Sequence, residues 1–269
     1  MPEVETVRRM LEPAMQGARF RRIILNRPNL RIPFPEHFVE RLRGKTVSAI
    51  TRRGKYLMVT LSSGETLIMH LGMSGWFHVA ATGDRTREAD AHDHVIFVMS
   101  SGRTVVFNDP RRFGFMDLVP AAGLGDYPSL RAMGAEPLLP EFNAAVLAQK
   151  CRGKKVPIKV TLLDQRVVAG LGNIYASEAL HHAALSPLRK ASSIATATGK
   201  PKAMAERLAT GIKAVLTSAI RRSESPYRAG RFRVYERTGE PCLRAGCDGV
   251  IRQITQAGRS TFYCATCQR

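Results

Sequence analysis

The sequence predicts an α+β protein with three parts: an N-terminal antiparallel β-sandwich with a leading helix, a helical domain, and a C-terminal hairpin that carries cysteines. Three observations predict this class. Residues 18–119 alternate apolar, β-branched runs with short turns, residues from 135 onward show helical periodicity, and four of the five cysteines lie in the last 28 residues. Alternation every second residue is typical of half-buried strands, and apolar residues three or four apart are typical of helices.

The leading helix is predicted from VETVRRMLEPAMQG, residues 4–17. Its apolar residues Val4, Val7 and Met10 share one face, and Gly17 ends it. In the strand region that follows, SSGE and SSGR turns join apolar runs into hairpins. The stretch ATGDRTREADAH between the hairpins is expected to be an exposed polar loop.

Glycine and proline concentrate in PAAGLGDYP, residues 120–128, where the strand pattern stops. Such a segment is typical of a hinge between domains. We therefore divide the chain into a sandwich domain at 1–119, a linker at 120–134, a helical domain at 135–230 and a cysteine-bearing segment at 231–269.

The charge balance points to a polyanionic partner. Lys and Arg number 41 against 22 Asp and Glu, a net charge of +19. Nucleic acid is the first candidate and an anionic membrane surface the second, with a basic surface that has no partner as the alternative. No stretch approaches the roughly 18 apolar residues of a membrane span, and the first 20 residues lack the apolar core of a secretory signal. We expect a cytoplasmic protein.

The clustered cysteines form two pairs, Cys242 with Cys247 and Cys264 with Cys267. Two tight turns that offer two thiolates each suit a tetrahedral Zn²⁺ ion in a closed, structural site. Two disulfides or an iron–sulfur cluster are the alternatives, and the spacing and a reducing compartment oppose both. So short a segment is expected to fold only with its ion. Cys151 stands apart and is expected to be a buried apolar residue.

A second motif, GLGN, places Gly170, Gly172 and Asn173 between two helical segments. Such a turn exposes backbone N–H groups at a helix start, and these bind a phosphate with help from the helix dipole. A plain tight turn is the alternative, but the net charge favours a DNA phosphate. Between the cysteine pairs, QAGRST predicts a hairpin tip that presents Arg259.

Several stretches of the chain resemble bacterial formamidopyrimidine-DNA glycosylases, and they occur in the order PEVET, RRGKYL, HLGMSG, HDHV, NDPRRFGF, GLGNIYASEAL, VYERTGEPC and AGRSTFYCATCQ. The resemblance spans the whole chain. It implies a β-sandwich, a helix–two-turn–helix domain and a zinc finger, with damaged double-stranded DNA as the partner of a monomer. It also implies excision of oxidised purines, such as 8-oxoguanine and formamidopyrimidines, followed by cleavage of the DNA backbone.

The resemblance implies four catalytic residues. Pro2 becomes the N-terminal amine once Met1 is removed, and it would attack C1′ of the deoxyribose to form a Schiff base. An α-amino group has a pKa of roughly 7.7–8.0, so a useful fraction is unprotonated at neutral pH. Glu3 is implied as the neighbouring acid and proton shuttle. Lys55 would assist elimination, and Arg259 would contact phosphate and serve the second elimination.

The resemblance also implies residues that hold DNA once a base is flipped out of the duplex. Met73 would fill the gap, Arg111 would pair with the orphaned base, and Phe113 would kink the duplex. Without the motifs, core packing is the alternative for Met73 and Phe113. The other implied DNA contacts are His70, His92, Lys154, Asn173 and Tyr235, together with Lys159 near the lesion pocket.

Two stretches depart from the family's pattern. The family begins Met-Pro-Glu-Leu-Pro-Glu-Val-Glu-Thr, so three residues are absent here, a length of about 4.5 Å as helix. Pro2 and Glu3 therefore align either with the catalytic pair or with the Pro-Glu that starts the helix. The segment 222–231 is shorter than the family's Gly-rich loop, which leaves the lesion preference open. The rival functions are an endonuclease VIII-like glycosylase for oxidised pyrimidines and a catalytically weakened protein that binds damaged DNA.

Overall fold

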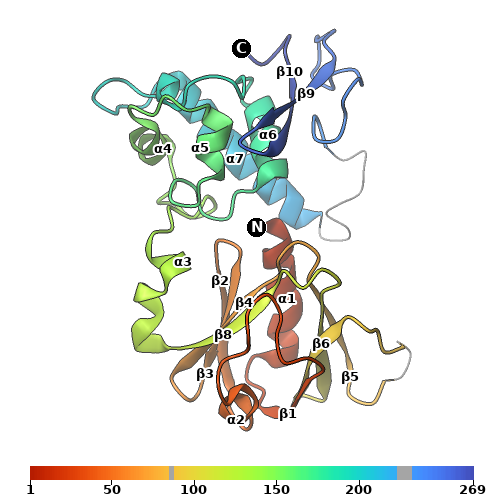
Figure 1. The fold of residues 1–269 in the computed structure, drawn as a ribbon. Coiled ribbons are helices and arrows are strands. Elements are labelled where there is room, and N and C mark those ends of the chain that lie inside the picture. Colours follow the sequence, from red (N-terminus) through yellow and green to blue (C-terminus); the bar gives the residue numbers. More distant parts are fainter. Residues whose placement is uncertain (85–87, 223–231) are drawn as a thin grey trace. The chain divides into compact units, whose positions relative to one another are not determined.

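Hairpin pairing dominates the first half of the chain in the computed structural model, and helices dominate the second (Figure 1). The structure describes residues 1–84, 88–222 and 232–269. By its internal contacts the chain divides into a sandwich unit, Glu3–Arg131, and a helical unit, Ala132–Arg269 together with Met1–Pro2. The predicted α+β class is confirmed.

Two antiparallel four-stranded sheets form the sandwich unit, with strand orders β1-β6-β7-β5 and β2-β3-β4-β8. The SSGE stretch turns β3 into β4 and the SSGR stretch turns β6 into β7, as predicted. The strands are β1 Phe20–Leu25, β2 Val47–Arg53, β3 Tyr56–Leu61, β4 Glu65–His70, β5 Trp76–Ala81, β6 Asp93–Met99, β7 Arg103–Asn108 and β8 Phe115–Pro120.

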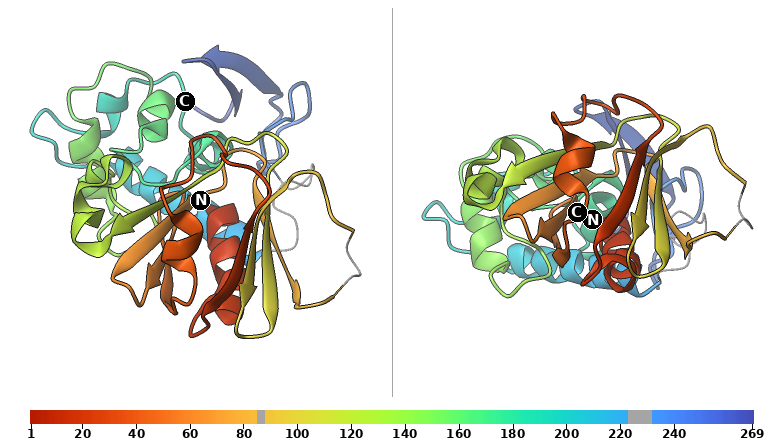
Figure 2. Two further views of the ribbon diagram at one scale, coloured as in Figure 1. Left: turned by 60° about the horizontal axis from the view of Figure 1, so that its bottom comes forward. Right: turned by 90° about the horizontal axis from the view of Figure 1, so that it is seen from below.

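The leading helix α1 (Pro2–Met15) lies beside these strands (Figure 2). Proline suits the first helical position because its missing N–H has no partner there in any helix. Val4, Leu11 and Met15 are buried in the same core as residues of both sheets. Burying each such side chain stabilises the fold by roughly 1.5–3 kcal/mol, so α1 is an integral part of the sandwich core. The short helix α2 (Phe38–Leu42) follows β1.

Two short helices occupy most of the segment predicted as a linker: a 3₁₀ helix, η1 (Ala121–Asp126), and α3 (Pro128–Arg131). No side chain of η1 is buried. The four-part domain division remains a prediction, and its boundary at 230–231 lies outside the described residues.

The helical unit is built around α6 and α7, which pack against each other. Asn143 caps α4 by accepting the Val146 N–H at 3.0 Å, which explains where that helix begins. Leu162, Leu180 and Ile212 are fully buried in the shared core. The helices are α4 Ala144–Cys151, α5 Ile158–Leu163, α6 Asn173–His182, η2 Ala191–Ile194 and α7 Ala203–Arg221.

The C-terminal hairpin pairs β9 (Ile251–Gln256) with β10 (Arg259–Cys264), and Ala257 and Gly258 form its tip. Its own apolar core is small: Val234, Cys242, Ile251, Phe262 and Cys264. A core of this size does not hold a fold unaided, so the hairpin needs further support. Among the described residues, no helix is both long and apolar enough to cross a membrane.

Candidate nucleic-acid interface and zinc centre

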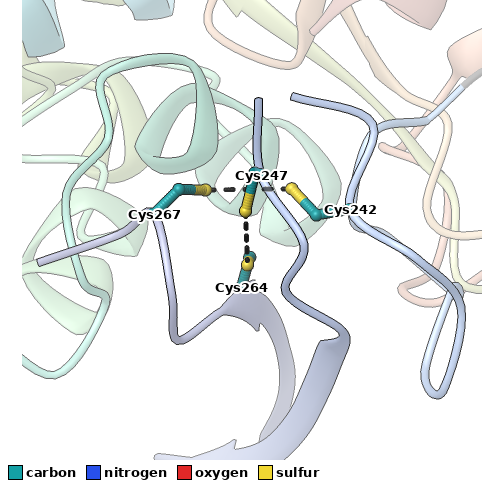
Figure 3. Close-up of side chains that lie close together, drawn as sticks. All are labelled: Cys242, Cys247, Cys264 and Cys267. Carbon is teal, nitrogen blue, oxygen red and sulfur yellow. Dashed lines mark hydrogen bonds between the residues drawn. The ribbon is translucent and has the colours of Figure 1, made fainter. Parts of the chain in front are cut away.

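The four clustered cysteines converge on one point (Figure 3). Their sulfur atoms all lie within 4.8 Å of one another, with Cys242 Sγ 3.8 Å from Cys267 Sγ and Cys247 Sγ 3.7 Å from Cys264 Sγ. Four sulfurs arranged tetrahedrally about zinc have edges of about 3.8 Å, because each Zn–S bond is about 2.3 Å. Disulfide sulfurs would lie about 2.05 Å apart. The donor set therefore fits one zinc ion held by four thiolates.

A glycine beside the cysteines allows this close approach. The Gly249 N–H donates to Cys247 Sγ at 3.4 Å, and a Cβ at position 249 would lie 2.6 Å from Cys264 Sγ. Any larger residue would push a sulfur off the tetrahedron. The cysteine signature in the sequence does not include this glycine.

The turn before α6 is joined to the hairpin by a buried ammonium. Lys159 is 0% exposed, and its Nζ donates to Asn173 Oδ1 at 2.6 Å, to the Ser260 carbonyl at 2.8 Å and to Thr261 Oγ1 at 2.7 Å. Asn173 Nδ2 also donates to the Ser260 carbonyl, at 2.9 Å. These bonds fix α5, the start of α6 and the start of β10 together.

The hydrogen bonds of Lys159 are all made within the protein, and its expected place near the lesion pocket remains a prediction. An ammonium has three N–H donors, and all three are used in these bonds. Burial lowers the pKa of Lys159 to about 8, and the nearby Arg259 guanidinium acts in the same direction. Arg259 is the first residue of β10 and is exposed at the hairpin tip, as predicted.

The start of α6 is the place where the sequence predicts a phosphate site, and that role remains a prediction. Gly172 precedes it in extended backbone and provides no side-chain cap. Tyr235 packs edge-on against Phe262 with ring centroids 5.0 Å apart, and burial raises the pKa of its hydroxyl, which therefore stays protonated at neutral pH. Lys154 is exposed in the segment before α5.

Two loops of the sandwich unit meet through glycine. A Cβ at Gly72, whose φ is +66°, would lie 2.4 Å from both Gly114 N and Phe113 C. Only glycine tolerates that backbone conformation and that approach together. The contact brings the loop that carries Met73 against the loop that carries Arg111 and Phe113.

Met73 and Phe113 project from these loops as predicted, with exposed fractions of 62% and 42%. The Arg111 guanidinium lies 4.7 Å from the centre of the Phe113 ring, a cation–π contact that orients both side chains. The three side chains predicted to fill the gap, pair with the orphaned base and kink the duplex are thus neighbours on the sandwich unit. Their roles toward DNA remain predictions.

A buried aspartate, which the motif reading did not single out, holds the two loops in place. Asp109 is 0% exposed and accepts hydrogen bonds from Ser74 Oγ at 2.6 Å and from the Gly114 N–H at 2.7 Å. Ser74 Oγ in turn accepts the Arg111 N–H at 3.3 Å. Asp109 belongs to the NDP stretch. That stretch is the signal in the sequence that could have indicated this supporting role.

Lys55 and His70 lie at one end of the sheet β2-β3-β4-β8. Lys55 is in the turn between β2 and β3, and His70 ends β4. Burial, together with the charges of Lys55 and Arg31, lowers the pKa of His70 to about 4. Neutral His70 accepts the Gly72 N–H at Nδ1, at 2.9 Å. This hydrogen bond helps to hold the loop that carries Met73.

His92, Pro2 and Glu3 complete the predicted set. His92 is exposed, and its Nδ1 lies 2.8 Å from Asp90 Oδ1. Pro2 is buried as the first residue of α1, and Glu3 is half-buried as the second. Pro2 and Glu3 therefore start α1, and their alignment with the family's catalytic pair remains a prediction.

The first turn of α1 also carries Glu5, an acidic residue whose role the sequence did not reveal. Glu5 forms ion pairs with Arg8, Arg9 and Arg52. Burial alone would raise the pKa of Glu5, but the hydrogen bonds from these arginines outweigh burial and hold the pKa below its usual value. Glu5 thus ties α1 to β2.

Family models match three consecutive parts of the chain. The formamidopyrimidine-DNA glycosylase N-terminal domain matches residues 1–116, the formamidopyrimidine-DNA glycosylase H2TH domain matches residues 133–229, and the zinc finger found in FPG and IleRS matches residues 239–269. The chain belongs to the formamidopyrimidine-DNA glycosylase family. The zinc finger match agrees with the four-thiolate geometry, and the predicted zinc ion is confirmed as the cofactor.

Curated relatives of the family agree over their full length. Formamidopyrimidine-DNA glycosylase of Afipia carboxidovorans is 50% identical, with 100% of this chain and 99% of the relative covered. That of Methylobacterium radiotolerans is 52% identical, with 100% and 98% covered.

Solved structures of the family agree equally well. The Lactococcus lactis enzyme bound to FAPY-dG-containing DNA has a TM-score of 0.87 at 31% identity, covering 100% of this chain and 99% of that one. MutM in complex with DNA containing carbocyclic 8-oxo-G has a TM-score of 0.87 at 32% identity, with the same coverage. Both solved relatives are glycosylases on damaged DNA.

Proposed function

We propose that this chain is a base-excision-repair glycosylase that removes oxidised purines, 8-oxoguanine and formamidopyrimidines, from duplex DNA and then cleaves the abasic site as a lyase. The observation that carries the proposal is the joined pair of loops bearing Met73, Arg111 and Phe113, in a chain that matches this family from end to end. A base cannot be reached inside a duplex, so the damaged nucleotide is flipped out. The three exposed side chains fill the gap, pair with the orphaned base and hold the kink.

The DNA backbone is held by the helical unit. The start of α6, the exposed Lys154 and Arg259 at the hairpin tip are the sites proposed to hold phosphates. The net charge of +19 adds long-range attraction. His70 and His92 on the sandwich unit and Tyr235 on the helical unit add further contacts.

Catalysis in this proposal starts from the N-terminal amine. With Met1 removed, the Pro2 nitrogen attacks C1′, the base departs, and an iminium links the protein to the opened sugar. Glu3 transfers the proton that ring opening requires. Lys55 and Arg259 assist the eliminations that break the backbone on either side of the sugar.

Borohydride trapping tests the covalent step. Borohydride reduces the iminium, so we expect a stable adduct between the protein and a duplex that contains an abasic site. The matched control is Pro2→Gln, which retains Met1 because removal of methionine requires a small second residue; this variant should bind the duplex but yield no adduct. Intact mass and N-terminal sequencing of the wild-type protein establish whether its amine is that of Pro2.

A second candidate function rests on the position of Pro2 at the start of α1. In this candidate the chain binds damaged DNA through the same loops, but its amine lies too far from the sugar to react. Displacement of a reacting group by only 1 Å costs on the order of a hundredfold in rate. Tight binding of an abasic duplex without any trapped adduct would establish the second candidate and overturn the first.

Lesion preference is tested by excision of 8-oxoguanine opposite cytosine against excision of thymine glycol. The proposal expects the purine lesion to be removed faster, and faster removal of thymine glycol would assign the chain to the endonuclease VIII-like type. The loop at 223–231, on which the sequence comparison of these types depends, lies outside the described residues.

A further inference from the structure

A histidine at the end of α6 lies against the zinc centre. His181 is 4% exposed, and its Nε2 lies 3.4 Å from Cys242 Sγ. We propose that His181 and Arg244 are part of the zinc site: His181 donates a hydrogen bond to the Cys242 thiolate, Arg244 holds His181 in place, and together they set how tightly the finger retains its metal.

The direction of the bond follows from the chemistry of the thiolate. A zinc-bound cysteine sulfur is deprotonated and can only accept, so the imidazole must carry its proton on Nε2. A distance of 3.4 Å suits an N–H···S bond, which is longer than N–H···O because sulfur is larger. The bond therefore requires neither a charged imidazole nor a change of rotamer.

Arg244 fixes the imidazole through the backbone. Its guanidinium donates to the His181 carbonyl, and to the His182 carbonyl at 3.4 Å. Carbonyls in the last turn of a helix lack partners within the helix, and a cation there is favourable. Arg244 stands between Cys242 and Cys247 in the sequence, within the first metal-binding turn. One arginine thus touches both the helix end and the metal-binding turn.

The charges explain why these contacts matter for the ion. Four thiolates around Zn²⁺ leave a net charge of −2, and each hydrogen bond donated to sulfur spreads part of it. Groups that hydrogen-bond to metal ligands typically alter metal affinity 10- to 100-fold.

The zinc hairpin also contacts the other end of α6. Asn173, the first residue of α6, donates to the Ser260 carbonyl in β10, while His181 in its last turn meets Cys242. Gln268 Nε2 also donates to the Leu185 carbonyl just beyond α6, at 2.8 Å. The zinc hairpin therefore braces α6 at both ends, and the ion contributes to the position of that helix.

Zinc release from the loaded protein tests the proposal. With a chromogenic chelator in excess, His181→Leu should release zinc about tenfold faster than wild type. His181→Gln can place an N–H at similar reach and should return the rate toward wild type. The control His182→Leu alters the neighbouring, exposed histidine and should release zinc at the wild-type rate. A folded His181→Leu variant with wild-type release, or equal acceleration by His182→Leu, would overturn the proposal.

A measurement on the unmutated chain decides the matter even where the leucine variant fails to fold. In protein loaded with ¹¹³Cd and labelled with ¹⁵N-histidine, the proton on His181 Nε2 should show scalar coupling to the metal through the N–H···S–Cd path. Assignment of that proton follows from its loss in His181→Gln. A resolved His181 Nε2 proton with no coupling to ¹¹³Cd would refute the hydrogen bond directly.

Discussion

Glu178 offers the sharpest test of how α6 holds the start of the zinc finger. Its carboxylate is 6% exposed and accepts three backbone N–H groups from one stretch of chain: Arg233 at 2.8 Å, Val234 at 2.9 Å and Tyr235 at 3.0 Å. The perturbation is Glu178→Met, which keeps the side-chain volume and removes every acceptor. Glu178→Gln is the graded variant, because its single oxygen can still accept two of the three bonds.

The magnitude follows from the bond count. Hydrogen bonds to a charged group contribute about 1.5–3 kcal/mol each, so three contribute roughly 5–9 kcal/mol before any offset. Removing a buried carboxylate relieves a desolvation penalty of several kcal/mol. We expect Glu178→Met to lower the free energy of unfolding of the helical unit by about 3 kcal/mol. Glu178→Gln loses one bond and sets an N–H against an N–H, for a loss of about 1–2 kcal/mol.

Urea denaturation followed by circular dichroism at 222 nm measures the helical unit. With a slope near 2 kcal/mol/M, a loss of 3 kcal/mol lowers the midpoint by about 1.5 M. Glu206→Met is the matched control, because Glu206 is exposed in the first turn of α7 and should shift the midpoint by no more than about 0.3 M. Equal midpoints for Glu178→Met and Glu206→Met would refute the reasoning.

Three further predictions follow from the site. Lys159→Met leaves Asn173 Oδ1 and Thr261 Oγ1 without their donor and should weaken binding to an abasic duplex about tenfold by titration, whereas the exposed Lys150→Met should bind as wild type. Because the pKa of His70 falls to about 4 in the fold, the unfolded chain binds the extra proton between pH 6.5 and 4. The stability of the sandwich unit should therefore be complete above pH 6.5 and fall by up to about 3 kcal/mol as pH drops to 4. The fluorescence of Trp76, the single tryptophan, reports that loss, and a His70→Gln variant with an unchanged acid limb would contradict it. Gly72→Ala meets backbone at 2.4 Å, while Gly64→Ala has a similar φ of +78° and open space. Thermal unfolding should show that Gly72→Ala lowers the free energy of unfolding by more than 3 kcal/mol and Gly64→Ala by about 1 kcal/mol. Equal losses would show that the loop contact at Gly72 does not matter for stability.

Features that depend on the spacing of residues close together in the chain were predicted from the sequence. The cysteine pairs predicted the zinc centre because each of two short turns determines where its two thiolates lie, whatever the rest of the chain does. Glycines around Met73 and the turn before Phe113 predicted exposed tips for the same reason. The leading helix was also predicted, although its sequence leaves two alternative alignments for Pro2 and Glu3.

Features that depend on distant partners were not predicted. The buried hydrogen bonds of Lys159 could not be predicted, since its acceptors Ser260 and Thr261 stand about a hundred positions later in the chain. His181 belongs to a pair of adjacent histidines, and nothing in the sequence separates the one that faces zinc from the one that faces solvent. Glu178 lies on a helix face that packing alone defines. In each case the fold, and not the residue type, assigns the role.

The backbone contact at Gly72 has a consequence for engineering. The Met73 loop and the Phe113 loop touch through backbone atoms, and the hydrogen bonds of Ser74 and Asp109 hold them together. Neither loop can therefore be displaced or redesigned alone. A transplant of one loop from another enzyme would bring its own backbone path into collision with the loop left behind. The two loops therefore have to be varied together. A library that changes both is the smallest one that samples alternatives in this part of the molecule.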